Sequence, residues 1–250
     1  MYVANRLRPF VIALALIALI APTSACGSET TKLTKANFAQ KVGEATKAKK
    51  SAHIESEIKT GVTVMSIEGD VGYQENSTTA QIELKQGQTS AGEMRLVDSH
   101  IYMSLPPLVP TGKFFEVTPE NKALGSIIKM MDGVGPQQAI DQLKKGLVSV
   151  KYIGQKKIGS TETAQYRITA DPKKMTDNLG SLPQQLVDKM KVMSYDVFLN
   201  DDFTMRRTYV KAAGSEITMD YTDWGKKVTV HAPAKYELVP APDFGSMGLE

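Results

Sequence analysis

Residues 62–74 read VTVMSIEGDVGYQ, and this stretch decides the fold class. Met65, Ile67, Val71 and Tyr73 are separated by even spacings, so an extended chain carries them on one side and polar residues on the other. Glycine, asparagine and serine flank the stretch, as expected where tight turns separate neighbouring strands. The pattern predicts one half-buried strand of an antiparallel sheet.

The same alternation extends along most of the chain. It begins with SAHIESEI at residues 51–58 and continues as an antiparallel meander through TAQIELK, GEMRLVD and HIYMSL, residues 79–85, 92–98 and 100–105. Asn200-Asp201-Asp202 and Ala213-Gly214 predict hairpin turns later in the chain. The strands predicted for the second half are residues 147–158, 163–171, 194–201, 205–212, 215–224 and 226–233.

Helical spacing interrupts the strands in three places. Residues 34–50 predict a first helix with Thr34 as its cap, since Phe38, Val42 and Ala45 lie on one stripe. The middle of the chain predicts two helices, with Leu124, Ile127, Ile128 and Met131 on the first and Ala139, Ile140 and Leu143 on the second. A third helical stretch, interrupted at Pro183, carries Met175, Leu179, Leu186, Val187 and Met190.

These elements predict an α+β protein, in which one large antiparallel sheet has a few helices inserted between its strands. A sheet of about ten strands twists strongly and tends to curl. If it curls around the inserted helices without closing, an apolar space is left between sheet and helices.

The first 26 residues predict export and lipid anchoring. Arg6 and Arg8 precede an apolar run of about a dozen residues, which is shorter than the ~20 residues of a bilayer span. Thr23-Ser24-Ala25-Cys26 follows and resembles a bacterial lipobox, with threonine at a position that usually holds leucine. We expect a signal peptide at residues 1–25, a lipidated tether at 26–34, one domain at 35–239 and a flexible tail at 240–250.

The charge of the mature chain does not favour nucleic-acid binding. The full sequence has 30 Lys and Arg residues against 27 Asp and Glu residues. Removal of Arg6 and Arg8 with the signal peptide leaves 28 cationic residues and a net charge of +1. We therefore expect no nucleic-acid partner.

The sequence contains none of the common catalytic or cofactor motifs. G-x-S-x-G, H-E-x-x-H, Walker and dinucleotide patterns are all missing. His53, His100 and His231 show no metal-ligand spacing. We expect a protein that is not an enzyme and has no metal or cofactor, although a hydrolase site assembled from distant residues is an alternative.

Two apolar features remain. Eleven methionines besides Met1 lie mostly on predicted helix stripes or strand faces. They suit either the filling of irregular gaps in the core or a surface that binds flexible ligands. Residues 104–120 read SLPPLVPTGKFFEVTPE. Phe114 and Phe115 are expected to pack under the sheet, whereas Leu108 and Val109 fit packing and an exposed rim equally well.

The order of these features resembles the LppX/LprG group of actinobacterial lipoproteins. The resemblance rests on the lipobox, SAHIESEI, DSHIYMSL, GKFFEV and the final ITMDYTDWGKKVTVHAP, whose Trp224-Gly225 turn is its most specific part. It implies a curved antiparallel half-barrel covered by helices, and a palmitate-type anchor on Cys26. It also implies a cavity that holds acylated lipid or glycolipid, location at the outer face of the plasma membrane, and cooperation with an envelope lipid transporter.

The residues expected to line this cavity come from the apolar faces of the predicted elements. The alternative function is a lipid-anchored interaction or sensor module with a packed core, which would bind a partner through residues 104–120. The expected lining residues are Leu84, Met94, Leu96, Ile127, Ile128, Met131, Ile140, Leu143, Leu186, Met190, Val197 and Leu199.

Overall fold

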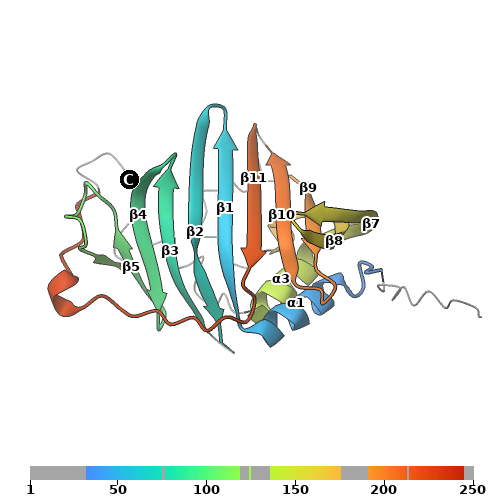
Figure 1. Ribbon diagram of the computed structural model, residues 1–250, viewed down its shortest axis with the longest axis horizontal. Helices are drawn as coiled ribbons and strands as arrows, with labels where there is room; N and C mark the ends of the chain where they lie inside the picture. The colour runs from blue at the N-terminus through green and yellow to red at the C-terminus, as the bar shows by residue number, and fades with distance from the viewer. Residues whose placement is uncertain are drawn as a thin grey trace, which may run out of the picture. The chain divides into compact units, whose positions relative to one another are not determined.

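The computed structural model describes residues 32–74, 77–118, 124, 136–175, 191–212 and 214–244 (Figure 1). The chain divides into two units, Met1–Thr31 and Lys32–Glu250. All described residues belong to the second unit.

One antiparallel sheet of eleven strands dominates this unit, in the order β6-β5-β4-β3-β2-β1-β11-β10-β9-β8-β7 (Figure 1). The first six strands form a meander, and β11 then pairs with β1 to join the second half. The sheet is open, which confirms the predicted fold class. The strands are β1 (Ser51–Thr60), β2 (Thr63–Tyr73), β3 (Thr78–Gln86), β4 (Thr89–Val97), β5 (His100–Ser104), β6 (Phe115–Val117), β7 (Leu147–Ile158), β8 (Thr161–Ala170), β9 (Met193–Leu199), β10 (Met205–Ala212) and β11 (Ser215–Thr222).

The register aligns the apolar positions of neighbouring strands. Ile58 lies opposite Met65 and also opposite Ile217, so three strands contribute apolar side chains to the same row. The predicted hairpins at residues 200–202 and 213–214 are confirmed, since β9 pairs with β10 and β10 with β11. One face of the sheet is consequently apolar and the other is charged.

Helix α1 (Phe38–Lys49) packs on the apolar face at the β7–β9 end. Phe38 is buried with its ring 5.7 Å from that of Tyr166. The predicted cap at Thr34 is wrong, because Asn37 is the N-cap residue. The Thr34 carbonyl accepts the Phe38 N–H, while the Thr34 N–H itself donates to Asn37 Oδ1.

Helix α3 (Pro136–Gly146) lies beside α1 (Figure 1). The short helix α4 (Pro172–Met175) follows β8. The two longer helices approach closely at Gly43, where a Cβ atom would lie 1.9 Å from Ile140 Cγ1. Ile140 is buried at this crossing. The helix predicted after Pro119 and most of the third helical stretch fall outside the described residues.

The prediction of a final strand at residues 226–233 is wrong. These residues have no regular secondary structure and continue into a single 3-10 turn, η2 (Lys235–Glu237). Both edges of β11 are already paired, with β1 and with β10, so no neighbouring edge is available beside it. The chain turns away at Gly225, whose φ of 85° favours glycine. We call residues 226–234 the strap.

Trp224 and Phe244 attach the two ends of this C-terminal segment. The Trp224 ring stacks on Tyr221, and its Nε1–H donates to the Met205 carbonyl. Leu238 bridges Phe114 at the opposite end of the sheet. Phe244 is buried with its ring 5.8 Å from that of Phe115, inside the segment expected to be a flexible tail.

Candidate functional site

Two separate clusters of buried side chains lie on the apolar face of the sheet. The first lies at the β7–β9 end, where Leu33, Phe38 and Val42 cover Tyr166 and Val197. The second lies at the β2–β6 end and includes Phe115, Phe244 and Val109. Each end of the face is thus closed by side chains from elsewhere in the chain.

Between these clusters, apolar side chains on the same face are only partly covered. They belong to neither buried cluster, and Met65 at one margin is 45% exposed. Register places them on one side of five adjacent strands, β3, β2, β1, β11 and β10. We call this set the central apolar face: Ile58, Met65, Ile67, Leu84, Val210, Ile217 and Met219.

Two phenols near the central apolar face are un-ionised at neutral pH. Burial and, to a smaller extent, nearby Tyr73 together raise the pKa of Tyr221 to about 12, while a hydrogen bond with Thr208 acts in the opposite direction. Burial also raises the pKa of Tyr73 itself. These two hydroxyl groups therefore carry no charge that a bound acyl chain would have to desolvate.

The structure distributes the described members of the predicted lining set over four environments. Val197 and Leu199 are buried in the first cluster, with Leu143 packed against it. Leu96 belongs to the second cluster, with Met94 at its margin. Leu84 lies on the central apolar face, and Ile140 lies between α1 and α3. Cys26, Ile127, Ile128, Met131, Leu186 and Met190 lie outside the described residues.

Sequence reasoning missed most of the central apolar face. Ile58, Ile67, Ile217 and Met219 alternate with polar residues as clearly as Leu96 does. The alternation identified their face correctly, but it carried no information about which part of the face other segments would cover.

The structure decides between packing under the sheet and an exposed rim for the apolar residues of segment 104–120. Phe114 and Phe115 are buried, as predicted. Val109 is buried as well, whereas Leu108 is 37% exposed. Most of the apolar side chains of this loop pack onto the sheet, where they form part of the second cluster.

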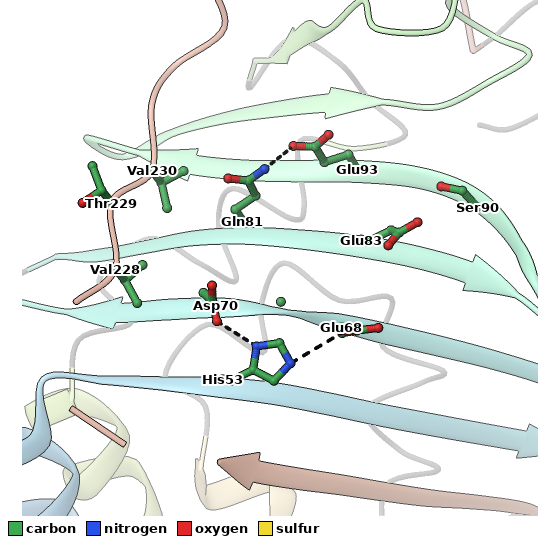
Figure 2. A pocket seen from close by; sticks show the side chains of 11 residues that line it. His53, Glu68, Asp70, Gln81, Glu83, Ser90, Glu93, Val228, Thr229 and Val230 are labelled. Atoms are coloured by element: carbon green, nitrogen blue, oxygen red, sulfur yellow. Dashed lines mark hydrogen bonds and ion pairs between the residues drawn. The ribbon is translucent and has the colours of Figure 1, made fainter. Parts of the chain in front are cut away.

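The opposite face of the sheet carries a polar pocket of about 440 Å³ under the strap (Figure 2). Val228, Thr229 and Val230 of the strap form one wall, and the side chains of β1–β4 form the floor. A row of five carboxylates crosses this face from β11 to β4, each directly opposite the next: Asp220, Glu55, Glu68, Glu83 and Glu93.

Cations compensate for this row, since like charges opposite each other destabilise a sheet. Lys85 Nζ is 2.8 Å from Glu68 and 3.2 Å from Glu83, and its hydrogen bond lowers the pKa of Glu68. Arg207 binds Asp220 through two hydrogen bonds of 2.6 Å. We call the five carboxylates the acidic row.

His53 provides the nearest arrangement to a metal site. Its Nδ1 is 2.7 Å from Asp70, so Nε2 points toward Glu55 and Glu68. The three donor atoms of His53, Glu55 and Glu68 lie within 4.8 Å of one another and could hold a divalent cation, although Lys85 competes for Glu68. The i, i+2 spacing of His53 and Glu55 on a strand is the sequence signal for this cluster, and Glu68 joins it only through the β1–β2 register.

The pocket does not assemble a hydrolytic triad from its own residues. Ser90 lies at the opposite end of the pocket from the His53–Asp70 pair in Figure 2. The nearest neighbours of the His53 ring nitrogens are carboxylates of Asp70, Glu55 and Glu68. The pocket is therefore an ion-paired surface, and the central apolar face is the stronger candidate for a binding site.

Comparison with known proteins agrees with this fold. The chain is similar to LprF from Mycobacterium bovis, with 16% identity and a TM-score of 0.56 over 80% of this chain and 97% of that one. It is similar to the Mycobacterium tuberculosis lipoprotein LppX, with 15% identity and a TM-score of 0.52 over 79% of this chain and 98% of that one. No curated protein sequence gives a significant match.

Within the described residues, none of the helices is both long enough and apolar enough to cross a bilayer.

The LppX_LprAFG lipoprotein family matches residues 34–230, which is most of the sequence. This match confirms the family resemblance and covers the meander and the Trp224-Gly225 turn. The chain belongs to the LppX_LprAFG lipoprotein family.

Proposed function

We propose that this protein is a membrane-anchored lipoprotein that binds an acylated lipid or glycolipid on its central apolar face and carries it across or within the cell envelope. The observation that supports the proposal is the partial exposure of this face between two buried clusters. A soluble domain gains little from leaving Ile58, Ile217 and Met219 partly uncovered unless a ligand covers them.

The energetics of such binding suit an acyl chain. Burying one methylene contributes about 0.8 kcal/mol, so ten methylenes contribute about 8 kcal/mol before the costs of association are subtracted. The contributing side chains are aliphatic or thioether groups, which select weakly between chain lengths. Specificity for a headgroup would have to come from other residues.

The anchor in this proposal is Cys26. Membership of a lipoprotein family implies an extracytoplasmic protein associated with the envelope, and Cys26 is the single cysteine of the chain. Acylation of this thiol would hold the domain at the outer face of the plasma membrane through a short polar tether. An envelope lipid transporter is the partner that would load or unload the domain.

The test is to purify residues 27–250 under mild conditions and to extract and weigh any bound lipid. This fragment retains every described element of the compact unit Lys32–Glu250. Near-stoichiometric phospholipid or glycolipid is expected. Protein that is empty after purification, and remains empty after incubation with membrane lipids, would contradict the proposal and favour the packed interaction module.

A matched pair of variants locates the binding face. Ile217→Asp places a carboxylate on the central apolar face, whereas Thr218→Asp places one on the opposite face of the same strand. The first variant should lose bound lipid at least tenfold while both remain folded by circular dichroism. Equal lipid content in the two variants would show that this face is not the site.

A further inference from the structure

The β7 end of the sheet carries a second surface, made of exposed lysines. Leu147, Ala170 and Met193 are aligned by the β7–β8 and β8–β9 pairings, so α3, α4 and the start of β9 meet at one corner. Four exposed lysines lie on this corner and on the adjoining edge strand: Lys144, Lys151, Lys173 and Lys191. Asp171 at this corner is 4.0 Å from Lys174, so its charge is balanced locally.

Exposed apolar side chains accompany these lysines. Val148 and Ile153 are the extra residues at the two register shifts of β7, and they are 44% and 43% exposed. Val192 directly precedes β9 and is 54% exposed. A bulge re-aims a side chain away from the ladder, and on an edge strand it also blocks pairing with another sheet.

The described part of the chain begins at this same edge, with Lys32 and Leu33. Lys32 Nζ is 5.0 Å from the centre of the Tyr152 ring on β7, and the Leu33 N–H donates to the Tyr166 hydroxyl on β8. Six residue steps separate Cys26 from Lys32, which span at most about 20 Å when fully extended. A lipid on Cys26 would therefore keep β7 within about this distance of the bilayer.

We propose that Lys144, Lys151, Lys173 and Lys191, together with Val148, Ile153 and Val192, form a docking surface for a bilayer rich in anionic phospholipid. We call this set the β7 surface. The proposal rests on the proposed function for the anchoring role of Cys26. Lysines near an anionic bilayer are attracted to its surface potential, and the three apolar side chains enter the headgroup region.

The charge distribution also gives the docked domain an orientation. The acidic row crosses β11 and β1–β4, away from the β7 edge. An anionic bilayer repels this row and attracts the β7 surface. Docking through β7 then turns the acidic row away from the bilayer while lipid enters or leaves the central apolar face.

The experiment sediments residues 27–250, without an acyl anchor, with vesicles of phosphatidylcholine alone or mixed with phosphatidylglycerol. Binding is expected to the anionic vesicles only. It should weaken strongly from about 0.1 M to about 1 M salt, as the Debye length falls from about 10 Å to about 3 Å. Lysines near such a surface contribute about fivefold each, so neutralising all four to glutamine should weaken binding more than a hundredfold.

A matched control neutralises four exposed lysines elsewhere, Lys59, Lys226, Lys227 and Lys235, and should retain most of the binding. Ile153→Asp should weaken binding about tenfold with no change in fold. Binding that is equal on both vesicle types, or lost equally in the two quadruple variants, would overturn the proposal.

Ile217→Asp separates this proposal from the proposed function. It should abolish lipid retention and leave vesicle docking intact, because Ile217 lies on the central apolar face. Protein that carries lipid but never docks would overturn the β7 surface alone. Protein that docks but never carries lipid would overturn the proposed function and keep the β7 surface.

Discussion

The two ends of the apolar face differ from its centre in what covers them, although all three parts share the same strand chemistry. At the β7–β9 end, α1 places Phe38 and Val42 over Tyr166 and Val197. In the centre, Ile58, Ile217 and Met219 have the same alternation but stay partly covered. Coverage by distant segments, rather than strand sequence, therefore separates structural core from candidate binding face.

The largest expected loss of stability follows from a substitution in the buried cluster at the β7–β9 end. Tyr166→Ala removes a ring that lies 5.7 Å from Phe38 and 5.4 Å from Tyr152, and it also removes the acceptor for the Leu33 N–H. We expect a loss of about 3–5 kcal/mol in the free energy of unfolding, measured by urea denaturation. Ile217→Ala is the control and should cost about 1 kcal/mol, because its side chain is only partly buried. Equal losses would remove the distinction between core and binding face.

An intermediate effect is expected where the two helices meet. Gly43→Ala places a Cβ 1.9 Å from Ile140 Cγ1, so α3 must shift away from α1. We expect a loss of about 1–3 kcal/mol in thermal or urea unfolding. Ile140→Ala removes both Cγ1 and Cδ1, so combining it with Gly43→Ala should cost less than the sum of the two single variants, as a double-mutant cycle would report. Additive losses would mean that Gly43 and Ile140 do not pack against each other.

The smallest effect is a change in the titration of one phenol. Because the folded-state pKa of Tyr221 is raised to about 12, it favours the folded state below the ordinary tyrosine pKa of about 10 and loses this contribution as pH rises toward 12. Ultraviolet titration should show Tyr221 as the latest phenol to titrate, after Tyr73, whose pKa burial also raises, and Tyr221→Phe should remove this late phenol. Tyr236→Phe is the exposed control and should leave the late phenol unchanged. An unchanged late phenol in Tyr221→Phe would contradict the burial of Tyr221.

The strands and their faces were predictable because alternation is a local property. Residues 226–233 show its limit: VTV alternates with polar neighbours, but both edges of β11 are occupied. The same limit applies to the binding face. The alternation predicts Leu96 as a lining residue, but Leu96 is 6% exposed in a packed cluster, because Phe115 and Phe244 come from other parts of the chain. A lysine at Leu96 is therefore expected to unfold the domain.

The acidic row and the β7 surface could not be predicted without the strand register either. No single strand contains the acidic row, since its five carboxylates come one from each of five strands. The β7 surface likewise combines α3, α4 and two strands. Their assembly depends on contacts between residues that are distant in sequence. The meander and the Trp224-Gly225 turn, in contrast, can be recognised in the sequence itself and lie within residues 34–230, which match the family.

The measurement that tests the central claim most directly is photocrosslinking of residues 27–250 with a fatty acid that carries a photoreactive group on its acyl chain, followed by mass spectrometric mapping. The account predicts labels on Ile58, Ile67, Ile217 and Met219, which excess unlabelled lipid should suppress. Labels confined to the polar face under the strap, or none in folded protein, would contradict it.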